Sequence, residues 1–243
     1  MAGTLVLRLE GDLARFVPSR RRRDELRVPL DATSTLGHLV ESTGVPLPEV
    51  GSLRLGSVDL PPGHRPADGD LVVVAPVGRP QRLPAGPSRF LLDVHLGALA
   101  RRLRVLGVDT AYDREADDAA LAHRAAAEAR VLLTRDLGLL RRRAVPYCAY
   151  VRGRRTDEQL ADVLDRFAPP LAPYTRCTRC NGLLAPADKP SVAADLRPGT
   201  RRSYAAFSRC TRCGQVYWRG AHAGALDAVV RSATGRQSAS SPA

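Results

Sequence analysis

The chain has 243 residues, of which 44% are hydrophobic and 26% are charged, a composition typical of a soluble globular protein. Its longest apolar run, Leu71 to Ala75, is far too short to cross a bilayer. The first residues reach Arg8 and Glu10 too soon for the apolar region of a secretory signal. We therefore expect a cytoplasmic protein with no membrane partner, long enough for two modest domains.

The net charge of +12 lies entirely in the second part of the chain. Residues 1–80 carry 10 Arg and 10 acidic side chains, whereas residues 81–243 carry 27 Lys and Arg against 15 acidic side chains. This asymmetry indicates that a polyanion binds the second part, the alternative being a cationic surface that only confers solubility.

Residues 1–78 predict a small domain of the β-grasp, ubiquitin-like type. Alternating apolar residues indicate half-buried strands, and capping residues before residue 36 indicate a short helix. The predicted order is strand, strand, helix, strand and strand, at 4–9, 26–30, 33–40, 52–58 and 71–74. Pro and Gly then dominate residues 79–88, which we expect to be a linker.

Residues 89–170 show strands that alternate with helices. The predicted strands are 90–92, 108–112, 131–133 and 145–151, and the predicted helices are 96–106, 117–129, 137–143 and 156–167. This alternation predicts an α/β domain with a parallel sheet covered on both faces.

Four of the five cysteines form two nearly identical pairs, Cys177-Thr-Arg-Cys180 and Cys210-Thr-Arg-Cys213. A C-x-x-C turn directs two thiolates at one point, and two such turns complete the tetrahedral sulfur shell that Zn²⁺ favours. Each pair precedes a residue that tolerates a left-handed backbone, Asn181 or Gly214. The alternative is two disulfides, which the lack of an export signal disfavours.

A closed four-thiolate site leaves no open coordination position. We therefore expect a structural zinc in residues 171–223, followed by a helix end and a flexible tail in residues 224–243. The small polar residues from Ser232 onward predict that this tail is frayed.

Acidic residues follow the predicted strands of the parallel sheet, at the edge where such sheets bind ligands. Asp93 follows the first strand, Asp117 and Asp118 the second, Asp136 the third and Asp157 the fourth. Converging carboxylates repel one another unless a divalent cation lies between them, and Mg²⁺ or Mn²⁺ fits oxygen ligands. The alternative for these residues is helix capping, which weighs most for Asp157.

Together these residues resemble a known family, the ribonuclease domain named after the C-terminal part of the Mut-seven exoribonuclease. The matching segments include Phe90-Leu-Leu-Asp93, Leu132-Leu-Thr-Arg-Asp136, Cys177-x-x-Cys180-Asn181 and Cys210-x-x-Cys213-Gly214, with Tyr217-Trp218-x-Gly220-x-His222 after them. The resemblance implies a PIN-like nuclease fold with a zinc ribbon. It also implies that Asp93, Asp118 and Asp136 are metal ligands. This chain has Ala98 and Arg102 where the family usually has a basic residue and a Trp.

The N-terminal domain looks like the ubiquitin-like, sulfur-carrier-like domain often fused ahead of that family. It lacks the terminal Gly-Gly of a sulfur carrier and continues as Val77-Gly-Arg-Pro80. Thiocarboxylate chemistry is therefore not expected, and its protein partner is unknown.

The sequence predicts a metal-dependent ribonuclease that hydrolyses RNA. Its candidate catalytic residues are Asp93, Asp118, Asp136 and Asp157, and its candidate RNA contacts are Arg101, Arg135, Arg141 and Arg142. One alternative is a non-catalytic zinc-ribbon module that binds ribosomal RNA or tRNA. Another is a β-grasp protein that docks onto a sulfur-transfer enzyme. Exonuclease and endonuclease action both remain open, as does a role for His222.

Overall fold

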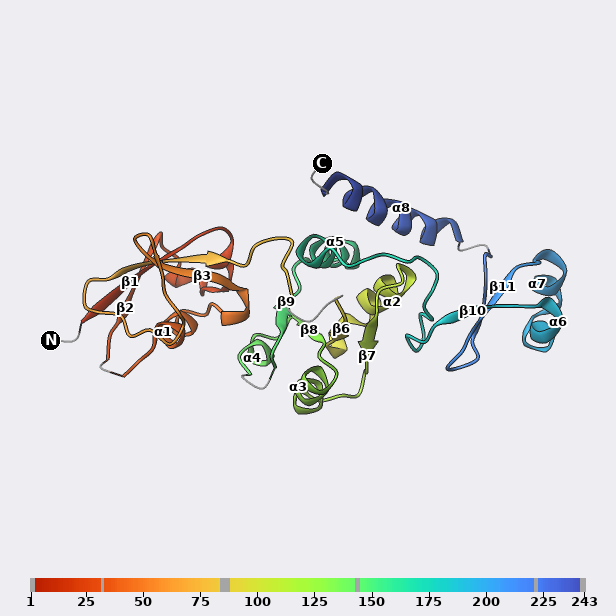
Figure 1. The fold of residues 1–243 in the computed structure, drawn as a ribbon, viewed down its shortest axis with the longest axis horizontal. Helices are drawn as coiled ribbons and strands as arrows, with labels where there is room; N and C mark the ends of the chain where they lie inside the picture. Colours follow the sequence, from red (N-terminus) through yellow and green to blue (C-terminus); the bar gives the residue numbers. More distant parts are fainter. Residues whose placement is uncertain (1–2, 32, 84–87, 143–144, 221–222, 241–243) are drawn as a thin grey trace.

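The computed structural model describes residues 3–31, 33–83, 88–142, 145–220 and 223–240, with only the backbone from 236 onward. Three sheets of five, four and three strands follow one another along the chain (Figure 1). No helix in these described ranges is long and apolar enough to cross a membrane.

The five-stranded sheet has the order β2-β1-β5-β3-β4 and forms the predicted ubiquitin-like domain. Its elements are β1 (Thr4–Leu9), β2 (Glu25–Pro29), α1 (Leu36–Ser42), β3 (Val50–Leu55), β4 (Val58–Asp59) and β5 (Leu71–Pro76). The central strands β1 and β5 are parallel, and the other pairs are antiparallel. The Thr35 side chain caps α1, as its position before the apolar spacing predicts. The apolar face of α1 then packs on the alternating apolar residues of the strands.

The four-stranded sheet has the order β7-β6-β8-β9, and all of its strands are parallel, as predicted. Its strands are β6 (Phe90–Leu92), β7 (Thr110–Tyr112), β8 (Val131–Thr134) and β9 (Cys148–Tyr150). Its helices are α2 (Gly97–Val105), α3 (Asp118–Ala127), α4 (Leu137–Leu140) and α5 (Thr156–Phe167). Several elements are shorter than predicted, and Arg143, the expected end of α4, lies outside the described residues.

The two faces of this sheet are covered by different helices. Phe90 and Leu92 point into a core shared with α2 and α5, whereas Leu91 points into a core shared with α3 and α4. This division follows from the two-residue period of a strand, and it explains why β6 is apolar throughout.

The order of the strands creates a switch point between β6 and β8. From β6 the chain passes through α2 to β7 on one side, and through α3 it returns to β8 on the other side. Helices therefore leave the carboxyl ends of β6 and β8 in opposite directions, which opens the crevice where doubly wound sheets bind ligands.

The two edge strands of the parallel sheet are both covered by neighbouring domains. At β9, the Tyr150 backbone N–H donates to Glu49 Oε1 (2.8 Å), and Glu49 belongs to the 3-10 helix η3 (Leu47–Glu49) of the ubiquitin-like domain. At β7, the Thr110 N–H donates to Asn181 Oδ1 (3.0 Å) from the cysteine-bearing segment. Both contacts satisfy backbone donors that an open sheet edge would leave unpaired.

The last sheet has the order β10-β11-β12. Its strands are β10 (Leu184–Ala187), β11 (Phe207–Cys210) and β12 (Val216–Trp218). The long connection between β10 and β11 contains two short helices, α6 (Lys189–Val192) and α7 (Pro198–Ser203). Val192 and Leu196 of this connection pack on Phe207 and Val216, so the insertion predicted between the two cysteine pairs has its own small core.

The prediction of a frayed tail from Ser232 is wrong, because helix α8 extends from Ala223 to Ser240. Figure 1 shows α8 running back over α2 and α5. Val229, Val230 and the buried Ala233 pack against the core that these two helices share. Small polar residues on the remaining faces concealed this contact in the sequence.

Candidate active site and metal centre

Asp93 lies at the switch point and is only 4% exposed. Its backbone N–H donates to Leu133 O (3.0 Å), which joins the carboxyl ends of β6 and β8. One carboxylate oxygen accepts the Val94 N–H (2.6 Å), and the other accepts the Thr134 hydroxyl (2.6 Å). Thr134 Oγ1 in turn accepts the Asp136 N–H (2.9 Å). The structure thus connects Asp93 to the start of the Asp136 loop through one threonine.

Asp136 is exposed and caps α4 by accepting the Gly138 N–H at Oδ1 (2.6 Å). Asp93 likewise caps a single 3-10 turn, η4 (Val94–Leu96). The capping alternative considered for both residues is therefore realised. Capping nevertheless does not require burial, and burying a carboxylate costs free energy that an exposed cap avoids. Asp93 is for this reason the less ordinary of the two.

Asp118 begins α3 and forms an ion pair with Arg142 Nη2 (3.3 Å), while its neighbour Asp117 caps the helix through Ala120 N–H (2.7 Å). Among the residues that the structure describes, Asp93, Asp118 and Asp136 do not form a group with ligand oxygens within 4.8 Å of one another. The structure therefore brings Asp93 and the Asp136 loop together, and it leaves Asp118 on the neighbouring helix.

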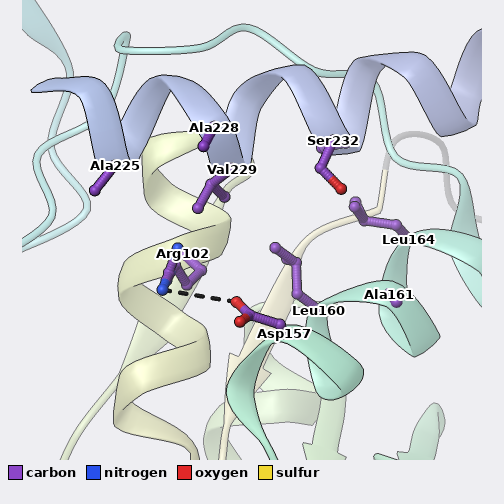
Figure 2. Close-up of a pocket in the computed structure, with 10 residues that line it drawn as sticks. Arg102, Asp157, Leu160, Ala161, Leu164, Ala225, Ala228, Val229 and Ser232 are labelled. Atoms are coloured by element: carbon purple, nitrogen blue, oxygen red, sulfur yellow. Dashed lines mark ion pairs between the residues drawn. The ribbon is translucent and has the colours of Figure 1, made fainter.

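Asp157 lies in a groove between α5, α2 and α8, where its carboxylate faces Arg102 Nη2 at 3.6 Å (Figure 2). Arg102 stands where the resembling family has an aromatic or basic residue, so this chain has an ion pair at that point. We assign Asp157 to this groove and leave it out of the metal site proposed below. His222 lies outside the described residues.

The four arginines predicted to contact RNA have different surroundings. Arg101 and Arg135 are exposed on α2 and just after β8. Arg141 donates to Gly44 O of the ubiquitin-like domain (3.3 Å), and Arg142 pairs with Asp118. Arg101 and Arg135 are therefore better placed for a phosphate than the two arginines that already have protein partners.

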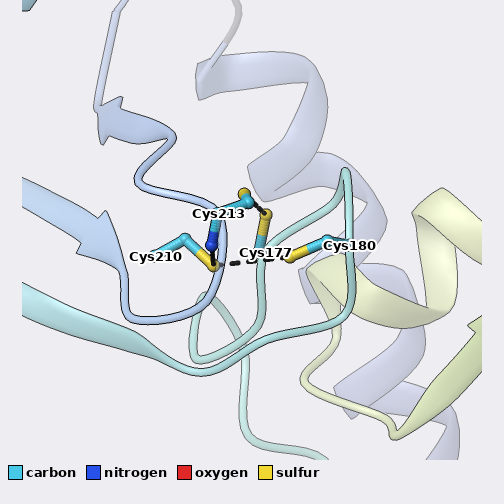
Figure 3. Close-up of side chains that lie close together, drawn as sticks. All are labelled: Cys177, Cys180, Cys210 and Cys213. Carbon is cyan, nitrogen blue, oxygen red and sulfur yellow. Dashed lines mark hydrogen bonds between the residues drawn. The ribbon is translucent and has the colours of Figure 1, made fainter.

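The four paired cysteines converge, with all sulfurs within 4.8 Å of one another (Figure 3). The sulfurs of Cys177 and Cys213 are 3.7 Å apart, and those of Cys180 and Cys210 are 3.5 Å apart. Zn–S bonds of about 2.3 Å in a tetrahedron place sulfurs about 3.8 Å apart, so the cluster fits zinc. All five cysteines are free, which excludes the two-disulfide alternative.

The backbone around the cluster has the predicted conformation, because Asn181 and Gly214 have φ angles of 68° and 72°. The Arg212 and Cys213 N–H groups donate to Cys210 Sγ (3.4 and 3.5 Å). The Tyr217 hydroxyl lies 3.0 Å from Cys177 Sγ. Burial acts to raise the pKa of Cys177, but the hydrogen bond from Tyr217 and nearby N–H groups outweigh it and lower that pKa to about 6. A thiolate, the form that binds metal, is thus favoured at Cys177.

Residues that sequence reasoning missed hold the cysteine turn against the parallel sheet. Arg104 is 3% exposed, and its guanidinium donates to Thr110 O (2.8 Å) and to Thr178 O (3.0 Å). Asn181 Nδ2 donates to Asp109 Oδ1 (2.8 Å). A charged residue in the middle of an apolar helix face was the signal for Arg104. Asp109, inside a predicted strand, had been left out of the candidate residues.

Close backbone approach completes this docking. Gly107 has a φ angle of +80°, and a Cβ on it would lie 1.9 Å from Ala172 O. Only glycine fits both constraints. The cysteine turn is therefore positioned by the nuclease-like sheet, and its metal would support that interface.

These features define an α/β protein with a ligand site at the switch point of a parallel sheet, a ubiquitin-like domain before it and a zinc-ribbon-type appendage after it. The chain belongs to the Mut7-C RNAse domain family, whose model matches residues 88–230. The model of the Mut7-C ubiquitin family matches residues 2–82. Membership supports a nuclease role in general terms.

Comparison with solved structures shows a similarity to SAMP1 from Haloferax volcanii, with 17% identity and a TM-score of 0.25. The match covers 35% of this chain and 100% of that one. A search of curated proteins gave no match.

Proposed function

We propose that the protein is a metal-dependent ribonuclease whose reaction takes place between the carboxyl ends of β6 and β8. Family membership supports the ribonuclease class. The observation that carries the site assignment is Asp93, a carboxylate with 4% exposure on a central strand and hydrogen-bonded to Thr134. Buried ionisable groups in such a crevice are more often functional than structural.

The oxygen donors at this edge fit a hard divalent cation such as Mg²⁺ or Mn²⁺. Asp93 and Asp136 would hold it, with Asp118 nearby. Mg²⁺ commonly keeps several water ligands and needs only one or two carboxylates, so the wide spacing of these side chains is compatible with the assignment. Such a cation supplies an activated water and offsets the charge that builds on phosphate.

The other residues act by positioning. Thr134 holds the Asp93 carboxylate and orders the turn that precedes Asp136, through its two hydrogen bonds. Arg135, which is exposed between them, would contact an RNA phosphate, and Arg101 would do so from α2. RNA is therefore the proposed partner.

The four cysteines are proposed to bind a structural Zn²⁺, consistent with their sulfur distances. Free thiols of this kind persist in a reducing cytoplasm, the proposed location. We further propose the divisions 1–78, 79–88, 89–170 and 171–223, with residues from 224 onward belonging to a helix that packs back on the nuclease domain.

Cleavage of labelled RNA with Mg²⁺, Mn²⁺ or EDTA tests the proposal. Asp93→Asn and Asp136→Asn should each lower the single-turnover rate by at least about 100-fold, because each removes a charge that the cation needs. RNA affinity should be retained. The combined loss should be far smaller than the product of the single losses, because the ligands act as a unit.

Asp117→Asn is the matched control, since Asp117 caps α3 as Asp136 caps α4. It should cleave at the wild-type rate. If Asp93→Asn and Asp136→Asn also kept that rate, the better description would be a non-catalytic zinc-ribbon protein that binds RNA.

A further inference from the structure

The ubiquitin-like domain carries a dense cationic segment, Arg20–Arg23, which we call the arginine run. It lies in the connection between β1 and β2 and begins inside the 3-10 helix η2 (Ser19–Arg21). All four of its arginines are exposed. Neither packing within the domain nor the hydrophobic core accounts for them.

The arginine run is connected to the carboxyl end of β9, on the edge of the sheet that carries the candidate active site. The preceding 3-10 helix η1 (Leu13–Phe16) places the Phe16 ring edge-on against Tyr150, with ring centroids 5.2 Å apart. Asp12 Oδ1, just before it, accepts a hydrogen bond from Arg152 Nη2 (2.9 Å).

Arg22 attaches the run itself to this contact. Its guanidinium donates to Val17 O (2.9 Å) and Arg15 O (3.1 Å), at the end of η1. The run therefore follows directly from the part of the domain that touches β9.

The arginines of this region fall into two groups. Those between the domains are ion-paired, as in Arg166 with Glu49 (2.6 Å) and Arg79 with Asp162 (2.8 Å). In the described part of the chain, the arginine run has no carboxylate oxygen within 4 Å, and the same holds for Arg135, Arg154 and Arg155 after β8 and β9. The second group thus presents cations without protein partners along one sheet edge.

From these observations we infer that single-stranded RNA extends from the candidate active site across the loop after β9 onto the arginine run. This inference rests on the proposed function and names the path of its substrate. Exposed guanidiniums bind phosphate oxygens in a bidentate manner without reading sequence. The ubiquitin-like domain then forms part of the RNA-binding surface.

The inference also changes the meaning of the zero net charge of residues 1–80. Their acidic residues are partly occupied by pairs elsewhere, as in Glu25 with Arg8 (2.7 Å) and Glu10 with Arg54 (3.3 Å). A neutral total therefore conceals a local cationic surface beside the nuclease domain.

The full-length double variant Arg20→Gln/Arg21→Gln tests the inference against the control Arg27→Gln/Arg65→Gln. The control removes two exposed arginines from the same domain, outside the run. Arg22 is left intact because it bonds the backbone of η1. Binding of a fluorescently labelled 20-nucleotide oligouridine is measured by anisotropy in EDTA over a range of KCl concentrations.

Each lost phosphate contact lowers the slope of log K against log salt by about 0.7 for single strands, so the test variant should lose about 1.4 from the wild-type slope. The control should keep the wild-type slope. Equal slopes for all three proteins would overturn the inference and leave the run as a solubilising or protein-binding surface.

Because EDTA prevents metal-dependent turnover, this binding result stands whether or not the wild-type protein cleaves RNA. Failure of the proposed function would appear separately, as absence of cleavage by the wild-type protein with Mg²⁺ or Mn²⁺. If cleavage occurs, the test variant should cut a dinucleotide at the wild-type rate, since so short a substrate cannot reach the run. A slower rate on the dinucleotide would contradict the assignment of the run to distal contacts.

Discussion

Glu49→Gln removes a charge that is buried at the boundary between the ubiquitin-like and nuclease domains. Glu49 is 0% exposed and Arg166 is 1% exposed, and Glu49 Oε1 lies 2.6 Å from Arg166 Nη1. The same oxygen accepts the Tyr150 N–H (2.8 Å). The amide can still accept that hydrogen bond, but it leaves the guanidinium without a compensating charge.

Breaking a buried pair by removing one partner costs about 3–5 kcal/mol. Arg166 keeps its hydrogen bonds to Gln81 Oε1 (2.8 Å) and Pro48 O (3.1 Å), which satisfy its donors but not its charge. For a chain of this size the loss corresponds to a melting temperature lower by about 6–20 °C. Glu25→Gln is the control, because its pair with Arg8 has a similar distance, 2.7 Å, with side chains 41% and 52% exposed. That change should cost at most about 1 kcal/mol.

Urea denaturation followed by far-UV circular dichroism measures both variants. We expect the Glu49→Gln curve to shift strongly or to separate into two transitions as the domains uncouple. Leu137 and Tyr150 pack against the core of the ubiquitin-like domain, so uncoupling should also loosen the turn at Asp136. A Glu49→Gln curve within about 1 kcal/mol of the wild type would refute the view that this pair holds the two domains together.

Two further predictions concern the cysteine cluster and its docking. Cys213→Ser should lower bound zinc towards zero in elemental analysis and unfold the ribbon, whereas Cys148→Ser, in the sheet core, should keep the metal; full zinc in both would contradict the four-cysteine site. Burial acts to raise the pKa of Asp109, but hydrogen bonds from Arg130 and Asn181 outweigh it and hold that pKa below its ordinary 3.8. A lowered native pKa stabilises the fold above pH 3.8, and that contribution is lost as the pH falls through the native value. Asp109→Asn should therefore be less stable than the wild type at neutral pH, with a difference that shrinks below about pH 4 in pH-dependent unfolding; a constant difference would show that the charge of Asp109 is not involved.

Features with local causes could be predicted from the sequence. The left-handed residues Asn181 and Gly214 follow from the geometry of a two-residue turn between cysteines, which involves no distant contact. The all-apolar β6 indicates a strand buried on both faces, and an acidic residue after it is then placed at the carboxyl edge. The family resemblance depends on these same short segments and was confirmed by the family match.

Features that depend on pairing between distant residues required the tertiary structure. Glu49 and Arg166 are 117 positions apart, and nothing near either residue shows that both are buried together. Likewise, Asp118 is held by Arg142 while Asp93 shares Thr134 with the Asp136 loop, although all three aspartates follow strands in the same way. Arg20–Arg23 lie in a part of the chain with no net charge, and only the packing of Phe16 on Tyr150 brings them to the nuclease domain. The sequence specifies which charges exist, but an arginine becomes a structural ion pair or a free phosphate contact only when folding brings a carboxylate to it or leaves it exposed.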